Sequence, residues 1–292
     1  MHPAPIQPFT LLFDEADALG PGLPADLQAS YGGDWCLPPL PPGRPYSYTN
    51  FVVSHDGRIS FDEPHRAGGG DVSRYAPHDL WLMALLRARA DAILTGGATL
   101  RIAQRHLWTP WATFPAEAAR LAHLRAAEGR VPLPLLVILS TNGDLPAAAP
   151  ALHVQEQPLL IATTQSGEAR ARAALAAHPH VTYHSSPGAT VDLVALLAVL
   201  REAYGVGSLL SEGGGRIYGA LLRAKLIDEV FTTLSPIVVG NRPPPAAPRP
   251  ALVEGVAFSP DDPPRLRLLS LRRHGDYLFQ RARFLWAPER QL

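Results

Sequence analysis

Two glycine-rich turns in the chain have the residue types that bind a phosphate group. Residues 96–99 follow a buried-looking strand over 92–95, and residues 212–215 follow an apolar strand. Glycines allow a ligand to approach the backbone closely, and a helix starting there directs free N–H groups toward an anion. A plain strand-to-helix turn would also use glycines, but two such turns suit the two ends of a pyrophosphate.

The spacing of these glycines differs from the G-x-G-x-x-G fingerprint of a Rossmann domain. A Rossmann domain is therefore not expected. Glu212 stands directly before the second glycine run and adds a titratable carboxyl group at its rim. Its alternative role is structural, as a carboxylate that holds the neighbouring backbone.

A third polar segment follows an expected strand over residues 46–53, which is rich in aromatic and β-branched residues. Asn50 lies in this strand, and Ser54 and Asp56 follow it, with Asp56-Gly57 supplying a turn. Asp56 has two possible roles, contact with a ligand or an Asx turn that only shapes the backbone.

The three segments together resemble the pyrimidine reductase family of riboflavin biosynthesis, the C-terminal domain of bifunctional deaminase–reductases. The order and spacing agree over roughly residues 44–285. The matching blocks are Ser54-x-Asp56-Gly57, Leu85 to Gly96 with Thr99, Glu212-Gly213-Gly214, and Leu226-Ile227-Asp228-Glu229-Val230 continuing to Gly240. The resemblance implies a dihydrofolate-reductase-like α/β fold, a three-layer sandwich with a mainly parallel central sheet and a C-terminal antiparallel hairpin.

The resemblance also implies that NADPH lies across the carboxyl ends of the strands and that Glu212 and Asp56 are the catalytic residues. Glu212 would relay a proton after hydride transfer. Hydroxyl groups without an acidic residue directly after the strand at 135–139 favour the 2′-phosphate of NADPH over the free hydroxyl of NADH. The expected cofactor-binding residues are Thr95, Gly96, Gly97, Thr99, Ser140, Thr141, Thr163, Gly213, Gly214 and Gly215. For the serines and threonines, helix capping is the alternative role.

A small-molecule substrate, a heterocycle or a sugar-derived carbonyl or imine, would contact the third segment and several arginines. The expected residues are Asn50, Ser54, Asp56, Arg74, Arg101 and Arg105. The chain departs from the family after Thr99, where most members carry Asp-Asp-Pro and this chain continues with Leu100-Arg101 and later Trp108. The two tryptophans of this stretch, Trp108 and Trp111, suggest a flatter or more apolar ligand. The loop over 58–76 is a candidate lid.

Two other functions remain open. One is a non-catalytic nucleotide-binding protein of the same fold, which would have no need of Glu212. The other is a reductase of a different pterin or pyrimidine, for which Asp79 in the helix after the first strand would be the acid. The Glu212-Gly213-Gly214 block favours the riboflavin branch.

The composition of the chain limits the classes of binding partner that we expect. The 26 basic and 26 acidic residues cancel, which gives no electrostatic case for nucleic acid or an acidic membrane. No apolar run is long enough to span a membrane, and no signal segment is evident. The single cysteine, Cys36, fits a cytoplasmic location and excludes a zinc deaminase module. The histidine spacing predicts no metal site.

The alternation of strands and helices predicts a mainly parallel sheet. We divide the chain into a Pro-rich, irregular N-terminal extension over 1–43 and a reductase domain over 44–292. The strands expected at 265–273 and 277–285 form a closing hairpin around Gly275-Asp276. Its exposed edge predicts a homodimer, unless the extension or the Pro-rich segment 243–250 covers that edge within one chain.

Overall fold

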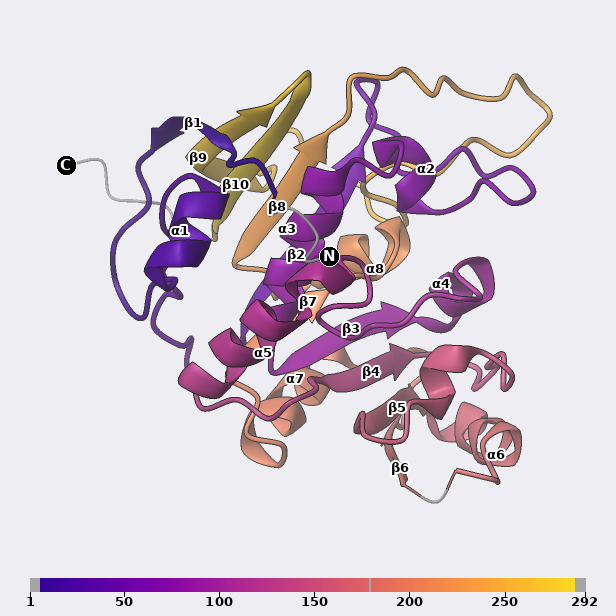
Figure 1. The fold of residues 1–292 in the computed structure, drawn as a ribbon. Coiled ribbons are helices and arrows are strands. Elements are labelled where there is room, and N and C mark those ends of the chain that lie inside the picture. The colour runs from indigo at the N-terminus through magenta and orange to yellow at the C-terminus, as the bar shows by residue number, and fades with distance from the viewer. Residues whose placement is uncertain (1–5, 179, 287–292) are drawn as a thin grey trace. The chain divides into compact units, whose positions relative to one another are not determined.

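A computed structural model describes residues 6–178 and 180–286 (Figure 1). The chain divides into two compact units, the first containing residues 6–39, Ser47–Leu82 and 215–286, and the second Leu40–Tyr46 and Met83–Gly214. The first five residues of the predicted extension and the last six of the predicted reductase domain lie outside the described residues, as does Pro179.

The first unit contains five strands of mixed direction. Their order is β1 (Thr10–Asp14), β9 (Arg265–His274), β10 (Tyr277–Leu285), β8 (Glu229–Leu234) and β2 (Tyr46–Val53). Only β2 and β8 pair in parallel; the other three pairs are antiparallel. Every residue of β2 is buried, as expected for a strand covered on both faces. The unit also contains α1 (Ala25–Tyr31), α2 (Gly69–Ser73), the first half of α3 (Pro77–Ala88) and α8 (Gly215–Arg223).

The second unit has five strands that all pair in parallel. Their order is β7 (Ser208–Ser211), β3 (Ala92–Gly96), β4 (Leu135–Leu139), β5 (Leu159–Thr164) and β6 (Val181–Ser186). The helices are the end of α3, α4 (Gly97–Ile102), α5 (Ala118–Ala127), α6 (Gln165–Ala174) and α7 (Leu193–Glu202), with 3₁₀ turns at Pro115–Glu117 and Pro150–His153. Across the sheet the chain steps from β3 to β6 in one direction and then returns past β3 to β7. With right-handed crossovers, α5 and α6 therefore lie on one face of these strands and α7 on the other.

The predicted mainly parallel sheet with helices between the strands and a C-terminal hairpin is confirmed. Gly275 adopts a φ of 56° in the hairpin turn, a conformation that glycine reaches without a Cβ clash. None of the helices in the described part of the chain is long and apolar enough to cross a membrane.

The N-terminal segment differs from the irregular extension that we expected. Besides the helical turns at α1, which the sequence indicated, it forms strand β1, which pairs with β9 through Thr10↔Arg273 to Asp14↔Ser270. Phe9 packs against Trp81 and Phe279 with ring centroids 5.5 and 4.8 Å apart. This segment therefore completes the sheet and the core of the first unit, and it covers part of the hairpin edge.

Candidate functional site

The carboxyl ends of β7, β3, β4 and β5 carry most of the predicted cofactor-binding residues of the second unit. The register aligns Leu94 of β3 with Ser211 of β7, and the Glu212 N–H donates to the Leu94 carbonyl at 2.8 Å. The turns after β7 and β3 therefore lie side by side. Such an edge of a parallel sheet is where α/β proteins bind nucleotides.

The glycines of the two turns have different surroundings. A Cβ on Gly97 would meet the Asp144 carbonyl at 3.2 Å, whereas one on Gly214 would meet no atom within 4 Å. On Gly215 a Cβ would stand 2.5 Å from the Ala251 carbonyl. Packing within the protein thus explains Gly215, while Gly214 leaves its side of the backbone open.

Hydroxyl groups at this edge are largely engaged by the protein. Ser140 Oγ donates to the Asp144 carbonyl at 3.0 Å, and Thr163 Oγ1 donates to the Thr141 carbonyl at 3.3 Å. The Thr141 side chain is exposed, and Thr99 is half-buried. Thr95 differs, because its buried Oγ1 has no hydrogen-bond partner in the described residues. An orphaned buried hydroxyl is a group that a ligand could satisfy.

Glu212 lies in an ion pair with Arg87 from the end of α3. Arg87 Nε donates to Oε1 at 2.7 Å and Nη2 donates to Oε2 at 2.5 Å. Arg87 is 0% exposed, and the Glu212 side chain is 9% exposed. This two-pronged geometry is the strong form of an arginine–carboxylate pair.

His106 completes the cluster. Arg87 Nη2 donates to His106 Nε2 at 2.6 Å, so the imidazole is neutral. Burial, together with the charge of Arg87, lowers the pKa of His106 to about 3. The guanidinium also donates to the carbonyls of Leu107 at 3.0 Å and Thr109 at 3.5 Å.

Arg101 and Arg105, the two arginines predicted to bind the substrate in this part of the chain, lie in different settings. Arg101 Nη1 donates to the carboxylate of Asp144 at 3.0 Å and to its carbonyl at 3.2 Å, and both side chains are exposed. Arg105 is exposed as well. Arg101 therefore lies beside Ser140, whose hydroxyl shares the Asp144 carbonyl.

In the first unit, Asp56 is held by three donors. Ser54 Oγ donates to Oδ1 at 2.7 Å, and the N–H groups of Val239 and Gly240 donate at 2.9 and 2.8 Å. Burial opposes the charge, but these hydrogen bonds outweigh it and lower the pKa of Asp56 to about 2. This anion joins the turn at 54–57 to the segment after β8.

Asn50 and Arg74 complete the predicted residues of the first unit. Asn50 is 8% exposed, and its Oδ1 has no hydrogen-bond partner in the described part of the chain. Arg74 is exposed at the C-terminus of α2 with a φ of 54°. Asn50 thus offers a buried acceptor, and Arg74 an exposed cation.

The predicted lid loop is attached to the Pro-rich loop of the same unit. Arg242 pairs with Asp62 at 2.7 Å and Arg249 with Glu63 at 3.0 Å. At the end of the loop, the Ser235 hydroxyl donates to the Val72 carbonyl in α2 at 2.8 Å. Several contacts would have to break for this loop to move.

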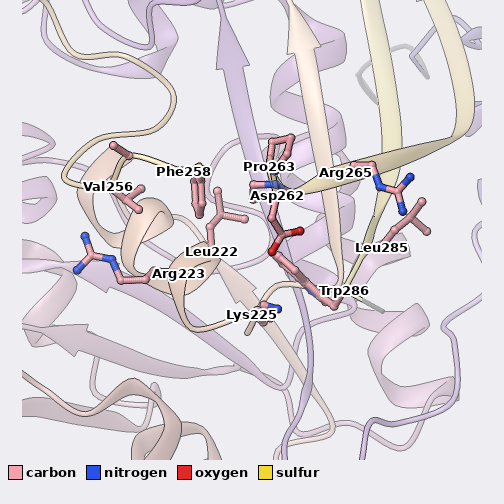
Figure 2. A pocket seen from close by; sticks show the side chains of 12 residues that line it. Leu222, Arg223, Lys225, Val256, Phe258, Asp262, Pro263, Arg265, Leu285 and Trp286 are labelled. Atoms are coloured by element: carbon pink, nitrogen blue, oxygen red, sulfur yellow. The ribbon is translucent and has the colours of Figure 1, made fainter. Parts of the chain in front are cut away.

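A pocket of about 610 Å³ lies in the first unit between the end of α8, the loop over 256–265 and the end of β10 (Figure 2). It combines cations with the aromatic rings of Phe258 and Trp286; the cations are Arg223, Lys225 and Arg265. None of the predicted site residues lines it. Across residues 6–178 and 180–286, no cluster of three His, Cys, Asp or Glu side chains is arranged to hold a metal.

Sequence reasoning missed Arg87 and His106. The available signal was Arg87 itself, a charged residue at the end of a helix whose preceding residues, Met83 to Leu86, are apolar. A charged group on a buried helix needs a partner, but the sequence does not name that partner.

Comparisons with known proteins agree on one family. The model of the family described as the RibD C-terminal domain matches residues 45–278. A curated relative from Archaeoglobus fulgidus, named 2,5-diamino-6-ribosylamino-4(3H)-pyrimidinone 5′-phosphate reductase, is 27% identical over 241 residues, 82% of this chain and 99% of the relative. A relative of the same name from Aquifex aeolicus is 27% identical over 223 residues, 74% of this chain and 85% of the relative.

Solved structures share the fold. A pyrimidine reductase-like protein from Corynebacterium diphtheriae has a TM-score of 0.63 at 19% identity, covering 83% of this chain and 93% of that one. A riboflavin biosynthesis reductase from Saccharomyces cerevisiae has a TM-score of 0.55 at 18% identity, covering 84% and 92%.

Proposed function

Because the chain belongs to the RibD C-terminal domain family, we propose that it is a pyrimidine reductase that uses a nicotinamide dinucleotide. Its substrate would be a phosphorylated ribosylaminopyrimidine of the kind named for its relatives. The observation that carries the proposal is the continuous match over residues 45–278, which includes the polar turn after β2 and both glycine turns. When bound, the dinucleotide supplies a hydride to a sugar-derived carbonyl or imine carbon.

The residues present fit such a cofactor. The open side of Gly214 leaves room for close approach to the backbone, and the orphaned Thr95 hydroxyl lies in the neighbouring strand. We assign the turns at 96–99 and 212–214 to the dinucleotide. Glu212 then acts as an anion at the edge of the site, since both of its oxygens face the guanidinium of Arg87.

We further propose that the cofactor is NADPH. We assign Arg101, which we expected from the sequence to contact the substrate, to the 2′-phosphate instead, because it lies beside Ser140 through their shared partner Asp144 and a nearby arginine commonly accommodates a 2′-phosphate. Calorimetric titration should give tighter binding of NADPH than of NADH, and Arg101→Met should reduce that preference. Arg105→Met is the matched control, an exposed arginine a few residues away. Equal affinity of the native protein for both cofactors would exclude this assignment.

On the substrate side, we propose that Asn50 Oδ1 accepts a hydrogen bond from a donor group of the ligand, because this buried oxygen lacks a partner among the described residues. Asp56 has a pKa near 2 and is fully ionised at neutral pH, so it orders the turn at Ser54 instead of donating a proton. Arg74 and Arg105 are exposed and remain candidates for the phosphate of the substrate.

The direct test is NADPH oxidation with the diaminopyrimidinone ribosyl phosphate and, separately, with its deaminated aminouracil analogue. We expect oxidation with one of the two. Cofactor binding without turnover on either would favour the non-catalytic nucleotide-binding protein. Turnover only on a pterin would favour the other reductase.

We also propose a cytoplasmic homodimer. The single cysteine fits a reducing compartment. In β9, Leu266 and Leu268 are 49% and 38% exposed, and β1 pairs only with residues 270–273 of that strand. Light scattering at dilute concentration tests the dimer, and a monomer with full activity would rule it out as a requirement.

A further inference from the structure

Arg87 uses all five of its N–H groups within the second unit. Two go to the Glu212 carboxylate, one to His106 Nε2, and the Nη1 group donates to the Leu107 and Thr109 carbonyls. A planar guanidinium fixes the directions of its partners, which an ammonium group cannot do. Three separate segments, the end of α3, the turn after β7 and the loop after α4, therefore share one side chain.

The carboxylate that Arg87 holds is restricted in the chemistry available to it. Each oxygen of Glu212 accepts one charge-assisted hydrogen bond from the guanidinium of Arg87. Each oxygen keeps a second lone pair that can accept a hydrogen bond. Glu212 is thus oriented as an acceptor, and its orientation is set by Arg87.

His106 is the second group that Arg87 orients. Its Nε2 accepts from the guanidinium, and the ring packs edge-on against Trp108 with centroids 4.8 Å apart. The loop at 106–109 is hydrogen-bonded to the same cation as Glu212. A shift of the guanidinium would move both.

We propose that Arg87 is a positioning residue that couples the Glu212 turn to the 106–109 loop and thereby sets the geometry of the reductase site. This inference rests on the proposed function for its effect on turnover. The coupling itself is a property of the protein alone.

Arg89 is the matched control. It is also 0% exposed, and its Nε and Nη2 both lie 2.7 Å from one oxygen of Glu128, Oε1, in a buried pair. Glu128 is 11% exposed against 9% for Glu212. Arg87→Lys and Arg89→Lys each keep the charge of a buried pair and lose the planar guanidinium that holds the carboxylate through two nitrogens.

We expect Arg87→Lys to lower kcat by roughly tenfold to a hundredfold, which is the usual effect when a group at an active site is displaced. Arg89→Lys should lower the melting temperature about as much as Arg87→Lys does, but it should leave kcat within about twofold of the native value. In a Glu212→Gln background, Arg87→Lys should add little further loss of kcat. Equal losses of kcat in the two lysine variants would overturn the inference. So would a double variant in which the separate kcat losses of Arg87→Lys and Glu212→Gln multiply in full.

A second readout does not depend on activity. The ¹⁵N NMR signal of His106 Nε2 should shift in Arg87→Lys and also in Glu212→Gln, because Arg87 donates to both side chains, and it should stay in Arg89→Lys. An unchanged signal in Glu212→Gln would refute the coupling. A native protein that turns over no substrate while the NMR shifts appear would instead refute the proposed function and leave the coupling intact.

Discussion

Asp79 in α3 is a buried carboxyl group with no basic partner in the described part of the chain. It is 2% exposed, and burial raises its pKa, a shift that the hydroxyls of Thr233 and Ser73 oppose. In the unfolded chain its pKa returns to the ordinary value near 3.9. A raised native pKa means that its contribution to stability is present at low pH and is lost as the pH rises toward the native pKa.

Asp79→Asn should therefore raise the free energy of unfolding at pH 7 to 8, where the native carboxyl group is costly to ionise. The amide can donate to the same hydroxyls without carrying a charge. Urea unfolding at pH 5 and pH 8 measures the effect, and the gain should be larger at pH 8. Turnover should persist; its loss with stability intact would favour the pterin-type reductase.

At the scale of elements, local pattern was sufficient where burial alone specifies a strand. The apolar runs at β4 and β5 predicted buried strands, and both formed. By contrast, β1 was missed because its residues are mostly exposed and its pairing partner is distant in sequence. The expected fold and family are confirmed.

The candidate site was less accessible to sequence reasoning than the fold. Glycines mark a turn, but Gly214 and Gly215 are adjacent and alike in sequence, and only the folded structure distinguishes the open one from the packed one. Likewise, Arg87 and Glu212 are separated by 125 positions. Their pairing depends on tertiary structure, which no local pattern encodes.

The two glycines provide an element-scale prediction. Gly215→Ala should destabilise the protein by about 1–3 kcal/mol, the usual cost of overpacking, since its Cβ would clash with the Ala251 carbonyl. Gly214→Ala should change stability by less than about 0.5 kcal/mol yet weaken NADPH binding roughly tenfold, or about 1.4 kcal/mol. Thermal unfolding and calorimetry of both variants measure this, and the reverse pattern would show that the turn does not contact the cofactor.

At the scale of the whole molecule, we expect the free energy of unfolding to fall already at pH values well above those at which carboxylates titrate. Burial and the charge of Arg87 lower the pKa of His106 to about 3, and burial with the neighbouring His274 lowers that of His78. In the native state both imidazoles therefore bind a proton less readily than in the unfolded chain. Their contribution is full above the ordinary pKa of 6.5 and is lost progressively as the pH falls from that value toward the lower native pKa.

We expect the free energy of unfolding to fall by a few kcal/mol between pH 7 and pH 4. Urea denaturation across this range measures it. His106→Asn keeps a neutral acceptor for Arg87, so this variant should have a flatter profile. A profile as steep as that of the native protein would assign the acid sensitivity to other groups.

The pairing of β1 with β9 has a consequence for how the protein is made. Asp14 and its partner Arg272 are 258 positions apart, so a ribosome adding about 5–20 residues per second needs roughly 13 to 50 s to connect them. The strands of the second unit all lie between residues 92 and 211 and leave the ribosome earlier. Nascent chains would hold Phe9 and its neighbouring apolar side chains unsheltered throughout that interval, a window in which chaperones and proteases compete with folding.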